Sequence, residues 1–180
     1  STSGSFAVND DLRVQGTVAM TEHASPTPPA LDPSSVTPRT GSNYPAPHAD
    51  AVGRREKRPL GDALGLTQFG VNLVRIPAGG MSSQRHCHSR QDEFVIVIAG
   101  ELVLVTDAGE QTLRPGMAAG FPAGAGDGHH LINRTGKDAI YLEVGDRTAG
   151  DEVDYADIDM LIRLIDGKRT YVHRDGTPYK

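Results

Sequence analysis

The sequence predicts an all-β fold, and three observations support this prediction. Short segments rich in apolar and β-branched residues follow one another along most of the chain. Turns rich in glycine and proline separate them, and the 180 residues include 21 Gly and 12 Pro. No long stretch repeats its apolar residues with the period of a helix. Together these features indicate a β-sandwich or barrel.

The N-terminal fifty residues are predicted to lie outside the barrel. Seven of the twelve prolines fall within residues 21–50. Because proline cannot donate a backbone hydrogen bond, such a stretch is unsuited to ladders and helices and has little to bury. Residues 1–50 are therefore predicted to be disordered or arm-like, with the last part able to lie on the domain. The basic run Arg54–Arg58 is interpreted as a solvated segment, with phosphate binding as the alternative.

Strands are predicted to begin after this basic run. Residues 70–76 form the first candidate and end at the loop 77–80. Residues 94–98 are apolar at every position, so this strand is predicted to be covered on both faces. One face would line the barrel interior, and the other would meet a second sheet or a second subunit. From this we predict a homodimer.

The remaining strands follow in order. A hairpin is predicted around residues 107–110, whose Asp-Ala-Gly-Glu sequence is typical of a turn. The other predicted strands cover residues 101–106, 111–113, 117–121, 129–133 and 139–144. A barrel domain is thus expected over residues 51–150. The acidic segment 151–159 is interpreted as solvated. Two strands, 160–165 and 169–173, are predicted around Asp166-Gly167, and residues 151–180 are expected to pack on the barrel or on a partner subunit.

Composition excludes several classes of function. The net charge of −5 argues against a nucleic-acid-binding surface. The single cysteine, Cys87, allows no internal disulfide and fits a reducing compartment. No stretch approaches the roughly twenty apolar residues of a membrane span, and no secretory signal is recognisable. We therefore predict a cytoplasmic protein with no membrane partner and with a small-molecule ligand or substrate.

A candidate metal site is the most informative feature of the chain. His86 and His88 are two residues apart, so their side chains point the same way in a strand. Glu93 follows five residues later, which predicts a bend between His88 and Glu93. His129 or His130 is the third candidate imidazole. Such a set suits one divalent ion, with Fe(II), Mn(II), Ni(II) and Zn(II) as alternatives.

The spacing around these residues carries a family resemblance. Gly80 is followed by five residues, then His86–His88, four residues, Glu93, six residues and Gly100. This pattern resembles the first motif of the cupin superfamily at every position. The resemblance implies a jelly-roll-like double-stranded β-helix, the cupin barrel.

A second, looser motif lies downstream. Gly116 is followed by five residues and then Pro122–Gly124. The family has a histidine three residues after this last glycine, whereas His129 stands five residues after it. Asn133 lies four residues after His129, as in the family. The chain thus resembles a cupin whose loop before the last ligand is two residues longer.

The choice between the two histidines rests on strand alternation. His129, Leu131 and Asn133 share one face, and the family pattern places an apolar residue between the ligand and the asparagine. Arg134 would share the interior face with His130, where it would be a poor companion. His129 is therefore preferred, with His130 as the alternative.

The resemblance implies a range of activities, including dioxygenases, oxalate oxidases, sugar-phosphate isomerases, decarboxylases and lyases. It also includes proteins that bind ligands without catalysis, and the fold alone does not choose. We expect a metal-dependent enzyme, of isomerase or dioxygenase type, acting on a sugar derivative, a hydroxy- or keto-acid or a diol. A non-catalytic binding or sensor protein is the alternative.

Residues that would bind the substrate are harder to identify. Arg75, Arg85 and Arg90 lie near the first motif in sequence and are candidates for holding a carboxylate or phosphate. Gln84 and Tyr141 are candidate hydrogen-bond donors around the site. No distinct general base stands out, so the catalytic residues are not assigned from the sequence.

Overall fold

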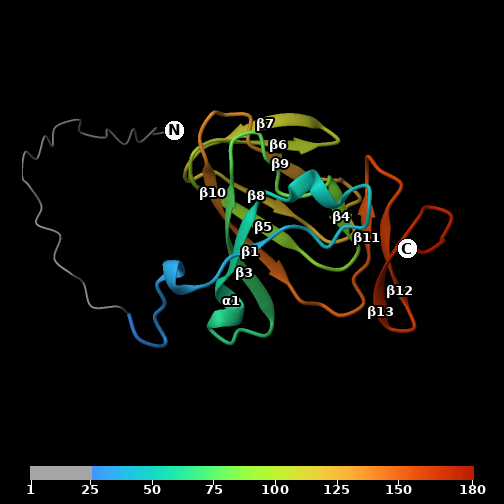
Figure 1. Cartoon of the computed structure of the whole chain (residues 1–180), viewed down its shortest axis with the longest axis horizontal. Helices are drawn as coiled ribbons and strands as arrows, with labels where there is room; N and C mark the ends of the chain where they lie inside the picture. Colours follow the sequence, from blue (N-terminus) through green and yellow to red (C-terminus); the bar gives the residue numbers. More distant parts are fainter. Residues whose placement is uncertain (1–25) are drawn as a thin grey trace, which may run out of the picture.

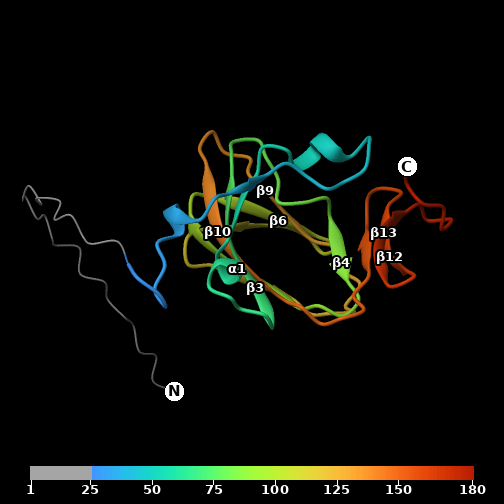
Figure 2. The ribbon, with the colours of Figure 1, turned by 60° about the horizontal axis from the view of Figure 1, so that its bottom comes forward.

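The barrel is the central feature of the computed structural model, which describes residues 26–180. Strands surround a central space, and only short helical turns interrupt them (Figures 1 and 2). This confirms the predicted all-β fold. The part of the predicted N-terminal arm that covers residues 1–25 lies outside the described residues.

One layer of the barrel is a six-stranded antiparallel sheet, with β10 between β3 and β5. In spatial order its strands are β1 (Arg39–Thr40), β2 (Glu56–Pro59), β3 (Phe69–Ile76), β10 (Ala139–Asp146), β5 (Glu93–Ala99) and β8 (Ala118–Phe121).

The opposite layer consists of two smaller antiparallel sheets. One contains β7 (Gly109–Leu113), β6 (Leu102–Thr106) and β9 (His130–Ile132). The other contains β13 (Lys168–Val172), β12 (Leu161–Ile165), β11 (Val153–Tyr155) and β4 (His86–His88). An isolated bridge between His86 of β4 and His129, just before β9, joins the two sheets. Both views show β12 and β13 at the outer side of the barrel, beyond β4.

Helical structure is minor. The elements are η1 (Pro33–Ser35), η2 (Ala49–Val52) and α1 (Leu60–Ala63). Within residues 26–180, no helix has the length and apolar character that a membrane crossing needs.

The core lies between the two layers, and the alternation of strand residues builds it. Val74 of β3, Tyr141 of β10 and Val97 of β5 are fully buried neighbours across the large sheet. Leu102 and Leu131 face them from the opposite layer and belong to the same apolar cluster. This core fills one part of the barrel and leaves the end near β4 to polar side chains.

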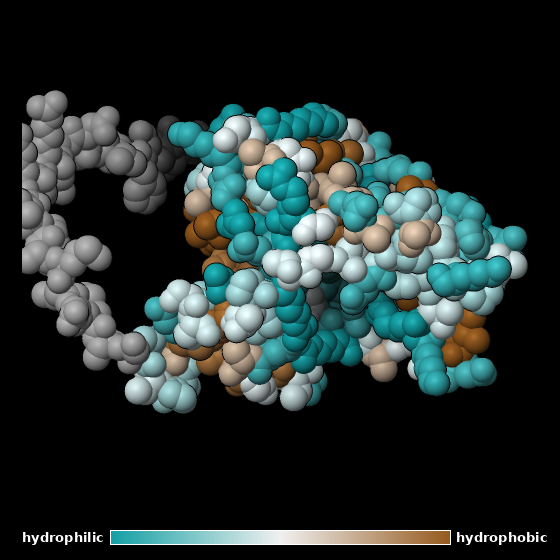
Figure 3. Space-filling model, viewed as in Figure 1, coloured by the Kyte–Doolittle hydropathy of each residue, from teal (hydrophilic) through white to brown (hydrophobic). Residues whose placement is uncertain are grey.

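Within residues 26–180, only one face of strand β5 is covered, and the predicted cover of its other face by a second subunit stays a prediction. Val95 and Val97 are buried, whereas Phe94 and Ile98 are 43% and 51% exposed. No other element of the described chain covers this outer face, so the structure leaves it for solvent or a partner. The face of the molecule in Figure 3 is mostly hydrophilic, with apolar areas separated from one another.

The proline-rich segment is more ordered over residues 26–50 than its composition predicts. Arg39 and Thr40 pair with Lys57 and Glu56, which adds β1 to the edge of the large sheet. The prediction of no ladder here is wrong because the prolines flank this pair and leave its backbone donors free. Beyond β1, Tyr44 packs against the aromatic ring of Tyr155 near the C-terminus.

The C-terminal segment corrects the interpretation of residues 151–159 as solvated. Val153 and Tyr155 are buried, and β11 pairs with β4 beside the two histidines. Acidic residues alternate with these buried ones, so the acidic composition of the segment does not indicate the strand that it forms. The predicted turn is confirmed, since Asp166 and Gly167 have φ values of 51° and 74° between β12 and β13.

Two glycines of the cupin-like motifs test whether the backbone at these positions requires glycine for its conformation or for close packing. Gly100 and Gly116 have φ values of 77° and 85°. A Cβ at Gly100 would lie 2.7 Å from the carbonyl oxygen of Asp138, whereas a Cβ at Gly116 meets no atom within 4 Å. Gly116→Ala should therefore cost about 1–2 kcal/mol from the left-handed conformation alone. Gly100→Ala should cost about 1–3 kcal/mol more from steric overlap.

Denaturant unfolding of the two variants checks this expectation. Equal losses of stability would show that the backbone around Gly100 relaxes and that close packing does not require this glycine.

Candidate metal centre

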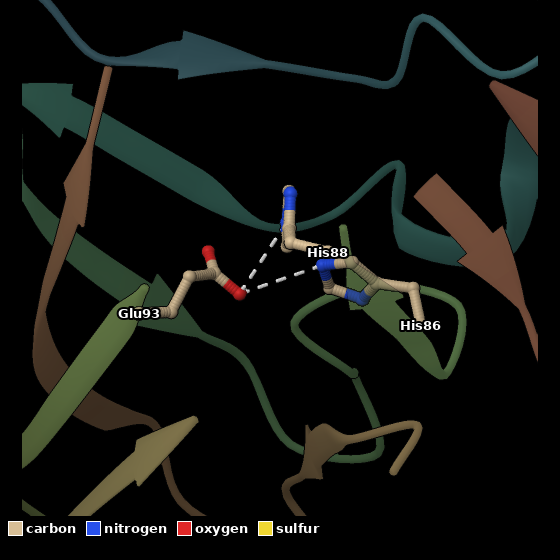
Figure 4. Close-up of side chains that lie close together, drawn as sticks. All are labelled: His86, His88 and Glu93. Carbon is tan, nitrogen blue, oxygen red and sulfur yellow. Dashed lines mark ion pairs between the residues drawn. The ribbon is translucent and has the colours of Figure 1, made fainter. Parts of the chain in front are cut away.

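The candidate metal centre is built where β4 and β5 meet. His86 and His88 share one face of β4 because they are two residues apart. The chain then leaves the strand over residues 89–92 and enters the large sheet at Glu93, the first residue of β5. The predicted bend is therefore confirmed. Figure 4 shows the three side chains pointing toward one another from these two strands.

The donor atoms lie close together. Nε2 of His86 and Nε2 of His88 are each 3.6 Å from Oε2 of Glu93. One donor atom from each of the three residues falls within a cluster whose members are all within 4.8 Å of one another. His129 joins through the same carboxylate oxygen, with its Nε2 2.9 Å from Oε2 of Glu93.

These distances fit a single bound ion. Two donors that are each about 2.1 Å from one ion, at tetrahedral or octahedral angles, lie about 3.0–3.4 Å apart. The separations of 2.9 Å and 3.6 Å between Glu93 and the imidazoles bracket this range. Imidazole nitrogens with one carboxylate are also the donors that Fe(II), Mn(II), Ni(II) and Zn(II) accept, so the residues fit a divalent ion without choosing among these metals.

The two candidate histidines of the second motif have different surroundings. His129 is buried, its ring stacks on Phe121 at 3.5 Å, and its Nε2 faces Glu93. His130 lines the same cavity, but its Nδ1 donates to the carbonyl oxygen of Ser83 at 3.0 Å. His129 is thus the one whose nitrogen approaches the carboxylate of the cluster.

The outer nitrogens of the β4 histidines are held by other groups. Nδ1 of His86 lies 3.0 Å from the carbonyl oxygen of Gln84, and Nδ1 of His88 donates to Oδ2 of Asp151 at 2.7 Å. These bonds leave each Nε2 free to face the cluster, as is usual for metal-binding histidines. The side chain of Asp151 is only 1% exposed. Sequence reasoning missed it because the acidic segment around it looked solvated.

Burial and the contacts within the cluster shift the pKa values of His86 and Glu93. Burial lowers the pKa of His86 to about 4, against a smaller opposing effect of the Glu93 charge. Burial alone would raise the pKa of Glu93, but the hydrogen bond with His129 and the neighbouring imidazoles outweigh it and lower that pKa. A neutral imidazole and an ionised carboxylate are the forms that bind a metal.

A cavity of about 260 Å³ opens beside the cluster. All four candidate ligands line it. Polar groups from the large sheet and from the segment before it also line it, namely Tyr44, Arg55, Lys57, Tyr141 and Glu143. The volume is at the lower end for ligand pockets, so it suits a small molecule.

The three arginines proposed from the sequence do not line this cavity. Arg75 points to the outer face of β3, where it pairs with Glu56 and Asp138. Arg85 pairs with two aspartates on the surface. Arg90 lies against Gly150. Nearness in sequence to the motif therefore misled the prediction, because strand alternation and local ion pairs direct these side chains elsewhere.

Arg55 and Lys57 provide the positive charge instead. They are two residues apart where the chain enters β2, so their side chains turn to the same side, into the cavity. Lys57 pairs with Glu143 at 2.7 Å. Arg55 donates to the carbonyl oxygen of Ser82, and its buried Nε has no hydrogen-bond partner among residues 26–180. The interpretation of Arg54–Arg58 as solvated is wrong at these two positions, and their alternation in the basic run was the available signal.

Comparisons with known proteins agree with this geometry. A family model described as "Cupin domain" matches residues 72–145. The structure is similar to that of a sugar phosphate isomerase of the cupin superfamily from Silicibacter pomeroyi, with 46% sequence identity and a TM-score of 0.81. That match covers 84% of this chain and 97% of the other. No protein with a curated description matches the chain.

Two further structures are more distant. One is a proposed sugar phosphate isomerase from Acidithiobacillus ferrooxidans, with 30% sequence identity and a TM-score of 0.63. That match covers 68% of this chain and 78% of the other. A polyketide cyclase from Streptomyces resistomycificus is 20% identical with a TM-score of 0.55, covering 65% of this chain and 78% of the other. At that identity the similarity concerns the fold alone.

The ligand assignment predicts the behaviour of a double variant. His86→Ala/His88→Ala should lose stoichiometric divalent metal, because two of the converging nitrogens are removed, while the barrel still folds. Elemental analysis of the purified protein measures the metal, and circular dichroism checks the fold. Unchanged metal content in the double variant would exclude the assignment.

Single variants separate the two remaining histidines. His129→Ala should weaken metal binding, and His130→Ala, the matched control in the same cavity, should leave it nearly unchanged. The reverse result would transfer the ligand role to His130.

Proposed function

The chain belongs to the cupin superfamily, and from that premise we propose that it is a metal-dependent isomerase of a small phosphorylated sugar. His86, His88, Glu93 and His129 would hold one divalent ion. The similarity to the sugar phosphate isomerase of Silicibacter and to the proposed one of Acidithiobacillus supports this activity.

The observation that carries this proposal is the combination of groups in one cavity. The metal-ligand cluster lines the same space of about 260 Å³ as the guanidinium of Arg55, whose Nε has no hydrogen-bond partner among residues 26–180. When bound, a divalent ion would supply Lewis-acid polarisation of the carbonyl oxygen of a sugar. This polarisation would favour isomerisation of a sugar phosphate, and a cation in the same cavity could hold the phosphate.

Arg55 is the residue that we assign to the phosphate. Lys57, the other cation of the cavity, is already paired with Glu143. Among residues 26–180, the guanidinium of Arg55 has no carboxylate partner. A partly buried guanidinium in that situation is stabilised by an anion, and its planar donors match phosphate oxygens. The hydroxyl of Tyr44, which accepts a hydrogen bond from the backbone of Gln84, lines the same cavity and can donate its own proton to a ligand.

A panel assay tests this function. The metal-loaded protein should interconvert at least one phosphorylated aldose and ketose of three to six carbons, and a chelator should abolish turnover. Arg55→Ala should raise KM about 10- to 100-fold, as expected when a charged hydrogen bond is lost. Arg75→Ala, which removes an outward-facing arginine, is the matched control and should leave KM unchanged.

Other outcomes would favour the alternatives. Oxygen consumption with a diol or a keto-acid would favour a dioxygenase. Tight binding of small ligands with no turnover of any kind would favour a non-catalytic binding protein. The cytoplasmic location stays a prediction.

We also propose that the protein forms a homodimer through the outer face of the large sheet. Phe94 and Ile98 of β5 are both exposed there. Apolar side chains grouped on one face are typical of an interface.

Light scattering should give twice the chain mass for the wild-type protein and the chain mass for Ile98→Lys. Leu164→Lys is the control, because Leu164 is also an exposed apolar residue but lies on β12. A monomeric wild-type protein at micromolar concentration would contradict this assembly.

A further inference from the structure

We propose that Glu143 is the base that moves the proton between two carbons of the substrate during isomerisation. This inference rests on the proposed function and adds a catalytic group to it. The sequence offered no distinct general base, and the structure brings a second carboxylate into the cavity beside the metal-ligand cluster.

The register of the large sheet fixes the position of Glu143 relative to the cluster. Glu143 of β10 pairs with Val95 of β5, and Gly145 pairs with Glu93. Glu143 and Glu93 are therefore diagonal neighbours on the inner face, a relation that places residues about 7–8 Å apart. Gly145 adds no side chain directly opposite Glu93. A small substrate held at the cluster would thus lie beside the carboxylate of Glu143.

Hydrogen bonds orient this carboxylate and leave one oxygen less engaged. Oε1 of Glu143 accepts from Nζ of Lys57 at 2.7 Å and from Nδ2 of Asn72 at 3.0 Å. Among the described residues, Oε2 accepts a single long hydrogen bond, 3.3 Å, from the hydroxyl of Tyr141. Lys57 and Asn72 therefore hold the side chain in place, while Oε2 keeps a lone pair available to a ligand.

Several other titratable groups of the cavity are already engaged or hold their proton. Glu93 and the imidazoles that face it are assigned to the metal. Burial, reinforced by the charge of Glu143, raises the pKa of Tyr141 well above its usual value, so its hydroxyl remains protonated. Lys57 is committed to the ion pair with Glu143. Glu143 is thus the carboxylate of this cavity that has no metal to bind.

The proposed step balances without any further reactant. Oε2 of Glu143 takes the proton from C2 of an aldose phosphate, and the C–H electron pair forms the C1–C2 double bond of an enediolate as the carbonyl electrons move to O1. The proton of the O2 hydroxyl passes to O1, the proton on Glu143 returns to C1, and O2 becomes the carbonyl oxygen of the ketose. The net change moves one hydrogen from C2 to C1 and one from O2 to O1.

Glu143→Gln tests this role because it keeps the size of the side chain and removes the base. With the sugar phosphate that the wild-type protein converts, kcat should fall about 10²–10⁴-fold, the usual contribution of a general base. Metal content by elemental analysis should not change. Affinity for inorganic phosphate, measured by calorimetry, should be equal or higher, because Lys57 loses its partner.

Two variants serve as controls. Glu56→Gln makes the same chemical change on the neighbouring β2, where Glu56 pairs with Arg75 away from the cavity, and it should keep wild-type kcat. Glu143→Asp retains a carboxylate and should keep part of the turnover. In deuterium oxide, the wild-type product should carry solvent deuterium at C1, as expected when an exchangeable carboxylate carries the proton.

The possible failures are distinguishable. Wild-type kcat in Glu143→Gln, or loss of metal together with turnover, would overturn the role of Glu143 and leave the isomerase proposal standing. The absence of turnover by the wild-type protein with every sugar phosphate of the panel would overturn the isomerase proposal and this step with it.

Discussion

The register of β10 between β3 and β5 is the constraint on which the rest of the structure depends. It places Tyr141 and Glu143 on the inner face, beside Val74 and Val95. A shift by one residue would turn Tyr141 and Glu143 outward and bring the side chains of the other face of β10 inward. The same register therefore places Tyr141 in the apolar core and Glu143, two residues further along β10, in the polar wall of the cavity.

The transition from core to site follows from the two strands that meet at the cluster. Along β5 the inward positions change from Val97 and Val95 to Glu93, and the opposite layer presents the histidines of β4 there. Because the cluster adjoins a dry core, charges at the site are weakly screened. Phe121, stacked on His129, extends this apolar surround to the second motif.

The segments outside the matched cupin region supply residues that line the cavity and orient one of the candidate ligands. The region 72–145 contains all four candidate metal ligands. Arg55 and Lys57 come from before it, and Asp151, which holds His88, comes from after it. A barrel that supports many activities can thus keep its metal ligands while the flanking segments determine which ligand fits and how one imidazole is oriented.

The sequence by itself determined the all-β fold, most of its strands and the convergence of His86, His88 and Glu93. These features depend on local signals: alternation, turn residues and short spacings within one segment. Only the tertiary structure decided which cations and acids share the cavity. Arg55, Glu143 and Asp151 are far apart in the chain, and they reach one site because strand pairing turns one face of each segment inward. Arg75 is close to the motif in sequence, but its place on the opposite face of β3 keeps it out of the cavity, since facing direction and not proximity in the chain decides which side chains meet.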